Sequence, residues 1–157
     1  MPTDQDRVWD MMDEIDFCMF VTNASGRLRS RPMSSIIKRD EGYVYFLANA
    51  RDAKDEEIAS DPKILLAYSN GSSQFVSAEG TARISADRVL VKRLWNPGAQ
   101  AFWPAGPDNP DIIAIIVRPS TAEYWDGPGT VVSSVKFAYA LMTGATPAMG
   151  ENAKVGM

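Results

Sequence analysis

The order of hydrophobic and polar residues predicts a helix over residues 3–16. Apolar side chains recur there every three or four positions and define one face, namely Val8, Met11, Met12 and Ile15. Thr3 followed by Asp6 is typical of a capping box, with Asp in the position usually held by Glu or Gln. The remaining positions are rich in acids, which we interpret as a solvated helix surface.

Most of the remaining chain has the pattern of short strands separated by turn residues. The predicted strands cover residues 17–22, 28–38, 43–47, 63–68, 74–85, 112–118 and 121–125. Gly80, inside one of them, indicates a bend or a bulge. Helices are predicted at residues 52–60, 85–95 and 131–142, a loop at 96–110, and a loosely ordered tail at 145–157.

These elements predict a mainly β fold with peripheral helices (α+β). Most connections between the predicted strands are too short for parallel crossovers, so antiparallel pairing is expected. About seven short strands at this spacing favour a closed or split antiparallel β-barrel. No internal repeat, low-complexity tract or linker interrupts the pattern, and we expect one domain over residues 1–157.

The composition excludes several kinds of chemistry. The 157 residues include no His, which rules out Ser-His, Cys-His and His-ligated metal sites built from this chain. Cys18 is the only cysteine, so an intrachain disulfide or a four-cysteine zinc site cannot form. No metal site is therefore expected.

Charge and hydropathy also set expectations about partners and location. Lys and Arg number 16 and Asp and Glu 20, a net charge of −4 that argues against a nucleic-acid partner. The longest purely apolar run, residues 112–117, is too short to span a bilayer, and the acidic N-terminus lacks the layout of a secretory signal. We therefore expect a cytoplasmic protein without a membrane partner.

Without histidine, the possible sources of chemistry are carboxylates, tyrosines, a metal held by oxygen ligands or a bound cofactor. Cofactors perform reactions that side chains cannot. The chain has 4 Trp, 5 Tyr and 6 Phe, a composition that suits such a role. Taken singly, each aromatic residue is more often part of a core than a ligand contact.

Basic residues cluster in two places. Arg27, Arg29 and Arg31 alternate along a predicted strand and should point to one face. Arg51 and Lys54 stand three residues apart at the start of a predicted helix. Each cluster is interpreted either as solubilising surface charge or as a phosphate clamp. No glycine-rich phosphate-binding motif accompanies them.

Several segments together resemble a known family. They are SRPMS at 30–34, FLANARDAK at 46–54, the strand at 74–83, LWNP at 94–97, AFWPAGP at 101–107 and EYWD at 123–126. Each segment is short, but their order along nearly the whole chain resembles the pyridoxamine 5′-phosphate oxidase-like FMN-binding split barrels. The similarity is greatest to the general stress protein 26 branch.

The resemblance implies a homodimer with FMN at the subunit interface and a flavin-dependent oxidoreductase with a nicotinamide donor and an unknown substrate. It implies that Arg31 and Lys54 hold the FMN phosphate, helped by Arg51. The residues implied to line the flavin are Met33, Ser34, Phe46, Leu47 and Ala48, with Gln74 and Phe75 on the strand that reaches across the dimer. Trp103 and Trp125 would cover the flavin ring, shape the substrate side of the site or pack in the dimer core. No side chain is expected to be an obligatory catalytic acid or base.

The chain also departs from the family pattern. Asp52 stands where a Ser is usual, Ala53 replaces an Arg, and Gln74 is one position out of register with the oxidase glutamine. The absence of His argues against true pyridoxamine 5′-phosphate oxidase activity. Three alternatives stay open: a non-catalytic flavin-binding or flavin-sequestering stress protein, a split barrel using deazaflavin, and one binding heme, for which the usual axial His is missing.

Overall fold

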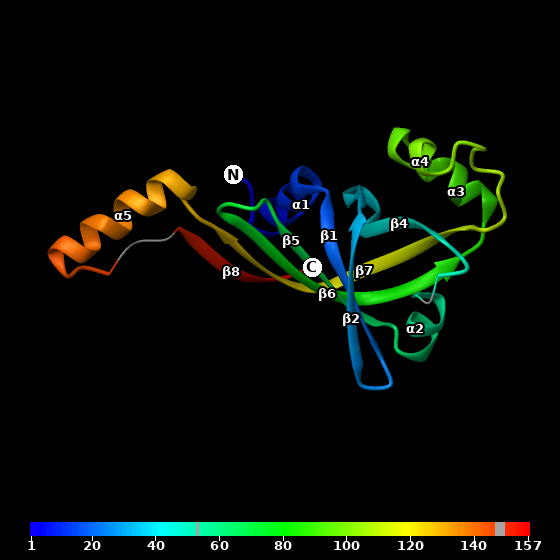
Figure 1. The fold of residues 1–157 in the computed structure, drawn as a ribbon, viewed down its shortest axis with the longest axis horizontal. Helices are drawn as coiled ribbons and strands as arrows, with labels where there is room; N and C mark the ends of the chain where they lie inside the picture. Colours follow the sequence, from blue (N-terminus) through cyan, green and yellow to red (C-terminus); the bar gives the residue numbers. More distant parts are fainter. Residues whose placement is uncertain (53, 147–149) are drawn as a thin grey trace.

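The strands form one antiparallel sheet, in which residues far apart in the sequence lie side by side (Figure 1). The computed structural model describes residues 1–52, 54–146 and 150–157, with side chains except at positions 54, 55 and 130–133. The described strands are β1 (Phe17–Ala24), β2 (Arg27–Ser34), β3 (Ile36–Lys38), β4 (Tyr43–Asn49), β5 (Lys63–Ser69), β6 (Gln74–Ser85), β7 (Ile112–Asp126) and β8 (Glu151–Gly156). The helices are α1 (Asp4–Ile15), the 3-10 turn η1 (Arg39–Glu41), α2 (Lys54–Ser60), α3 (Arg88–Leu94), α4 (Pro97–Phe102) and α5 (Thr130–Thr143).

The strand order explains why the sheet closes. The order is β2-β1-β5-β6-β7-β4-β3, with β8 on the free stretch of β7. β2 and β3 lie at opposite ends of this order, yet only Ser35 separates them in sequence. The sheet must therefore curl until its two edges meet. The predicted mainly antiparallel split barrel with peripheral helices is confirmed.

The N-terminal helix forms as predicted. The Thr3 Oγ1 atom accepts a hydrogen bond from the Asp6 amide at 3.1 Å, and the Asp6 carboxylate accepts one from the Thr3 amide at 2.6 Å. This capping box satisfies two amides that the helix itself leaves without partners. The predicted apolar face is buried at Val8, Met11 and Met12.

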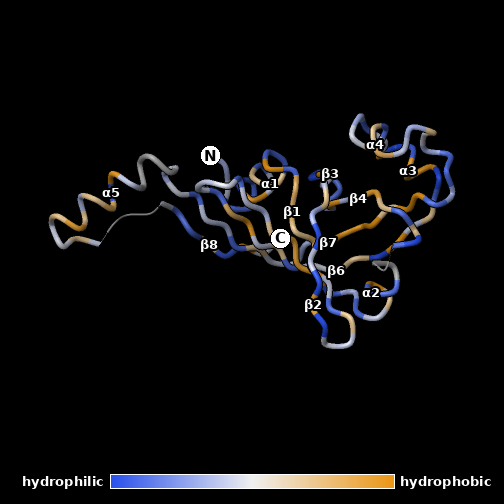
Figure 2. Tube along the Cα trace, viewed as in Figure 1, coloured by the Kyte–Doolittle hydropathy of each residue, from blue (hydrophilic) through white to orange (hydrophobic). Residues whose placement is uncertain are grey.

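Alternate residues of β4 enter two different hydrophobic clusters. Phe46 and Ala48 lie in the main core inside the barrel, where the Phe46 ring meets Phe20 edge to face at 5.1 Å. Tyr45 and Leu47 belong to a second cluster beside α3. Figure 2 shows the hydrophobic stretches of β1, β4 and β7 that build these cores.

Four predicted elements differ from the structure. The single strand predicted at 28–38 is divided at Ser35 into β2 and β3. A single strand, β7, replaces the two strands predicted at 112–118 and 121–125. The pairing with β4 ends at Val117 and the pairing with β8 begins at Thr121, so Pro119 falls between the two ladders and the strand continues through it. The predicted loop at 96–110 contains α4, whose first turn is capped by the Asn96 side chain accepting from the Ala99 amide at 2.9 Å.

The predicted loose tail at 145–157 is wrong for residues 151–156, which form β8, and its residues 147–149 lie outside the described part of the chain. This strand pairs with β7 from Thr121 opposite Gly156 to Asp126 opposite Glu151. Its alternate apolar residues Ala153 and Val155, and Met157 directly after it, pack against the main core. A period-two apolar pattern buried on one side is what holds the strand in place.

The bulge predicted at Gly80 is confirmed. The pairing of β6 with β7 shifts register between Glu79 and Gly80. A Cβ atom at Gly80 would lie 2.5 Å from the Arg118 carbonyl oxygen, so the backbones of the two strands approach too closely there for any side chain.

Two kinds of feature are absent from the described part of the chain. None of its helices combines the length and the hydrophobicity that crossing a lipid bilayer requires. Its Cys, Asp and Glu side chains form no group of three or more that could hold a metal ion.

Candidate functional site

A buried carboxylate, Glu57, joins two of the arginines that the sequence singled out. Its side chain is 6% exposed and projects from α2. Arg29 donates to Glu57 Oε1 at 2.8 Å, and Arg31 Nη2 donates to Oε2 at 2.6 Å. The Thr22 hydroxyl also donates to Oε2. Charge-assisted bonds of this length are among the strongest that side chains make.

The position of β2 at the end of the strand order explains this arrangement. Arg29 and Arg31 alternate along β2, so both side chains leave the strand on the same side, as predicted. Thr22 lies directly opposite Arg29 on β1. The two arginines thereby meet α2 beside the sheet, where Thr22 completes the cluster. We call Thr22, Arg29, Arg31 and Glu57 the arginine cluster.

The arginine cluster keeps a positive charge and an unused donor. Two guanidinium groups face one carboxylate, which leaves one net positive charge. Arg31 Nη1 is buried, and it has no hydrogen-bond partner among the described residues. A buried donor without an acceptor is costly, so an additional anion near Arg31 would stabilise the site.

Burial would raise the pKa of Glu57, but hydrogen bonds from Thr22 and Arg31 and the charges of both arginines outweigh it. The net effect is a pKa below the ordinary carboxyl value. Glu57 therefore stays ionised at neutral pH and is poorly suited to donate a proton.

A hollow opens beside the cluster, between the hairpin of β1 with β2 and the helix α2. It is lined by Ala24, Ser25, Arg27, Arg29, Glu56, Glu57 and Ser60. Arg27 and Arg29 line this hollow together with Glu56 and Glu57, so the charges of its lining balance. Arg31 is not part of the lining but lies next to it through its bond to Glu57. Any phosphate or carboxylate group received here would bind to the arginine donors.

The other predicted phosphate contacts are placed less favourably. Arg51 is exposed and pairs with Asp111 at 3.2 Å. The side chain of Lys54 and the whole of Ala53 lie outside the described residues. Asp52, whose position departs from the family pattern, is exposed. Arg31 is therefore the predicted phosphate ligand for which the geometry is most informative.

The predicted flavin-lining residues are divided between surface and core. Met33 is partly buried against the main core, and the Ser34 hydroxyl donates to Asp16 at 2.7 Å. Phe46 and Ala48 are buried inside the barrel, so only their backbone could meet a ligand. Leu47 lies on the other face of β4.

Trp103 shares the second hydrophobic cluster with Leu47. Its ring centroid lies 6.1 Å from that of Trp95 and 5.9 Å from that of Phe102. Trp103 is only partly buried and the Phe102 side chain is largely exposed. These rings therefore form an aromatic edge on α3 and α4, which fits either packing or a ligand contact.

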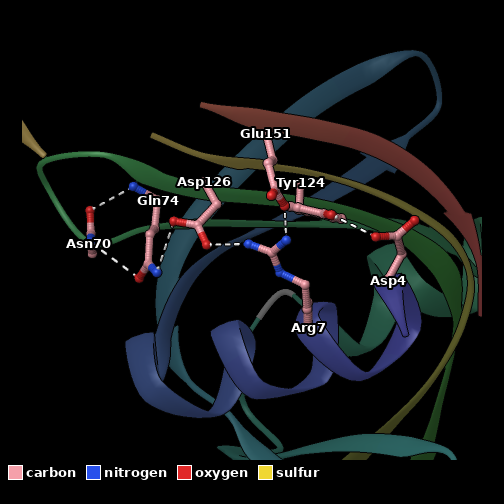
Figure 3. A network of polar contacts seen from close by, with 7 residues as sticks. All are labelled: Asp4, Arg7, Asn70, Gln74, Tyr124, Asp126 and Glu151. Atoms are coloured by element: carbon pink, nitrogen blue, oxygen red, sulfur yellow. Dashed lines mark hydrogen bonds and ion pairs between the residues drawn. The ribbon is translucent and has the colours of Figure 1, made fainter. Parts of the chain in front are cut away.

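Gln74 belongs to a second polar network, which Figure 3 shows around Arg7. Gln74 donates to Asp126 at 3.3 Å, and Asp126 accepts from Arg7 at 2.6 Å. Arg7 also pairs with Glu151 and lies over the Tyr124 ring at 5.1 Å. The network links α1 with the adjoining ends of β6, β7 and β8.

The arginine cluster and Gln74 are separate within one chain. Arg31 lies opposite Phe20, and the same row of the sheet continues through Leu66 to Ala78. Gln74 lies four residues before Ala78 on β6. The strands β1 and β5 separate β6 from β2, the strand that carries Arg31. Phe75 and Trp125 form a cross-strand pair beside Gln74. A single chain does not bring these residues to the arginine cluster.

The sequence reasoning missed Glu57 and Thr22. Glu57 is one of three consecutive acids before Ile58, near the start of a helix, where acids are commonly found because they interact favourably with the helix dipole. The available signal was its position next to Ile58, which is buried. A side chain beside a buried residue at the same helix end is a candidate for burial, and a buried acid needs a cation.

Comparison with known proteins agrees with the fold. The chain is similar to the structure of a general stress protein 26 from Jannaschia sp. CCS1, with 26% identity, a TM-score of 0.75 and 96% of each chain covered. It is also similar to a general stress FMN/FAD binding protein from Xanthomonas citri, with 24% identity, a TM-score of 0.69 and coverage of 78% of this chain and 87% of that one.

A relative known by sequence is the protein bli-3 of Neurospora crassa, 30% identical over 131 residues. The match covers 76% of this chain but only 63% of the length of bli-3. The profile of one protein family matches residues 3–148, nearly the whole chain. The chain thus belongs to the pyridoxamine 5′-phosphate oxidase-like family.

Proposed function

We propose that this chain binds FMN and acts as a flavin-dependent oxidoreductase of the general stress protein type. The observation that supports this most is the arginine cluster, in which a buried Arg31 N–H lacks an acceptor and one positive charge is left over. A phosphate group offers both the acceptor and the negative charge. The Xanthomonas citri relative is described as FMN/FAD binding, which agrees with this choice of ligand.

The residues present fit the phosphate end of the cofactor. Arg31 would bind a phosphate oxygen through Nη1 while Glu57 holds its other nitrogen in place. Lys54 and Arg51 follow β4 and would add charge from the start of α2. Ser34, Met33 and the backbone of β4 would lie along the ribityl chain and ring.

When bound, FMN supplies hydride and electron transfer that no side chain of this chain can perform. The protein's part is then to bind, orient and shield. Glu57 stays ionised and is paired with both arginines, so it holds the cluster in place and does not transfer protons. This division of labour suits a chain without histidine.

We also propose that the site is completed by a second copy of the chain. Gln74, Phe75 and Trp125 lie away from the arginine cluster within one chain, although the family resemblance assigns them to the flavin. Phe75 and Trp125 are 42% and 40% exposed, unusually open for paired aromatic residues. Two copies related by a two-fold axis would use the same face twice.

The direct experiment is to purify the protein and identify its chromophore. We expect a yellow protein with flavin absorbance, one FMN per chain, and FMN as the extracted species by mass spectrometry. If the extract contains deazaflavin or heme, that molecule is the cofactor and the assignment of FMN is wrong. A colourless protein that takes up no added FMN would overturn the proposal.

Turnover is a separate question from binding. The loaded protein should be reduced by NADH or NADPH under anaerobic conditions and reoxidised by an electron acceptor, with flavin absorbance as the readout. Bound FMN that no donor reduces would instead favour a flavin-sequestering protein. The two experiments therefore separate the cofactor from the activity.

A further inference from the structure

The helix α5 is apolar and unusually exposed. It projects from the end of the sheet beyond β8 (Figure 1). Five of its large side chains are between 55% and 87% exposed: Val135, Phe137, Tyr139, Leu141 and Met142. Figure 2 shows hydrophobic residues along the length of this helix. A helix of this composition is normally buried.

The exposed side chains lie on two opposite sides of α5. Val135, Tyr139 and Met142 follow the spacing of one helix face. Phe137 and Leu141 share another face, turned by about 200° because each residue advances about 100° around the helix. A helix that is apolar on opposite sides needs more than one surface to cover it.

Among the described side chains of α5, Ala140 is buried, whereas the five large apolar ones are not covered. Neither hydrophobic cluster of the described residues includes an α5 side chain. The helix α5 lies in the connection between β7 and β8, and the ends of these two strands are already paired, with Asp126 opposite Glu151. Antiparallel strands so joined need a turn of only about two to five residues. The chain instead builds a long apolar arm at this point, which burial in its own core does not explain.

Part of the outer face of the sheet is also apolar and exposed. On β1, Phe17 and Met19 alternate with the buried Cys18 and Phe20 and therefore point away from the barrel interior. They are 57% and 39% exposed, and Phe75 and Trp125 continue the same face on β6 and β7.

A groove crosses this outer face next to those side chains. It is formed by residues of β5, β6, β7 and β8, and most of its lining is polar or charged, including Ser77, Glu79 and Lys154. The apolar part of this face is the neighbouring patch of Phe17, Met19, Phe75 and Trp125. The chain therefore presents an apolar helix and an exposed apolar patch that such a helix could cover.

We propose that α5 is an arm that docks on the outer sheet face of a second copy of this chain. With two-fold symmetry each copy gives one arm and receives one, so both exposed surfaces are covered by the same contact. The five arm side chains present on the order of 500 Å², a large share of the roughly 800 Å² that each partner contributes to a standard interface. The proposal deepens the two-copy part of the proposed function by naming the contact.

The first test uses engineered cysteines in two separate populations of the chain. One population has Leu141→Cys on the arm, and the other has Phe17→Cys on the sheet face, outside the residues assigned to the flavin. The native Cys18 gives little background, because it is buried and burial raises its pKa to about 12. After mixing and exchange, a short bis-maleimide should link the two populations into a covalent heterodimer. Phe102→Cys, at an exposed position on α4, replaces Phe17→Cys as the control.

The second test measures dimer affinity by light scattering and sedimentation. Phe137→Glu and Leu141→Glu place a charge in the proposed contact and should weaken self-association at least about tenfold. Val89→Glu, at a 75% exposed apolar position on α3, should leave it unchanged. These side chains are exposed in the single chain, so the substitutions should not prevent folding.

The outcomes separate this proposal from the others. A dimeric wild type with no cross-link above the Phe102→Cys control, or with unchanged affinity in both arm variants, would overturn the arm contact while leaving the two-copy proposal intact. A monomeric wild type at micromolar concentration would overturn both. Flavin content, measured on the same samples, reports on the cofactor proposal independently.

Discussion

Arg31 on β2 donates a hydrogen bond of 2.6 Å to Glu57 on α2, and this contact joins an edge strand of the barrel to a short helix. The Glu57 side chain is nearly buried, whereas Arg29, its second partner, is about half exposed. The strength of the cluster therefore depends mainly on the Arg31 contact, since solvent screens the charge of the more exposed arginine.

Replacing the buried carboxylate should destabilise the protein. Glu57→Gln keeps the size of the side chain but removes the charge that faces two guanidinium groups. We expect the free energy of unfolding to fall by about 1–3 kcal/mol, as for loss of a charged hydrogen-bond partner. Urea denaturation measures this, with Glu56→Gln as the matched control because Glu56 is exposed. Equal stability of both variants would mean that the cluster contributes nothing to folding.

The same carboxylate should make stability depend on pH. The pKa of Glu57 is lower in the folded protein than its ordinary value of 4.5, so the folded state favours the ionised form. Its contribution is then complete above pH 4.5 and is lost as the pH falls through the lowered folded value. Unfolding curves measured at several acidic pH values should show a steeper loss in the wild type than in Glu57→Gln. Parallel pH profiles would contradict this assignment.

Removing Arg31 should weaken the binding of FMN through its phosphate. Arg31→Ala, and separately Lys54→Ala, should each cost about 1–3 kcal/mol of FMN affinity, because each substitution removes a charge-assisted hydrogen bond. Titration with riboflavin, which lacks the phosphate, provides the comparison and should show a much smaller change. Arg118→Ala, at an exposed position on β7, is the control for loss of charge alone. If neither Arg31→Ala nor Lys54→Ala lowers FMN affinity, the phosphate binds elsewhere.

Filling the space at Gly80 should strain the barrel. The Cβ of Gly80→Ala would lie 2.5 Å from the Arg118 carbonyl oxygen, a contact with backbone that cannot move aside easily. A loss of about 1–3 kcal/mol in unfolding free energy is expected, typical of overpacking. Gly156→Ala is the control, since an added Cβ there has no neighbour within 4 Å. Thermal denaturation of both variants decides whether the close approach at the bulge matters.

Local rules were sufficient for several parts of this fold. The capping box of Thr3 with Asp6 is a contact between near neighbours, and the positions of most strands follow from alternating side chains. Gly80 marked the bulge through its own backbone preference, although the strand that it approaches is distant in sequence. The strand β8 carried the same kind of signal. Ala153 and Val155 alternate with polar residues, and the prediction of a loose tail failed because short terminal segments were expected to be unordered.

The sequence by itself excluded histidine-based chemistry and a disulfide, because the chain has no His and one Cys, and this made a bound cofactor the leading expectation. It also identified Arg31 as a phosphate ligand candidate through the family resemblance. Only the tertiary structure paired Arg31 with Glu57, separated Gln74 from both, and left α5 exposed. These relationships join residues distant in the chain, and they depend on sheet closure and burial, which no local pattern encodes.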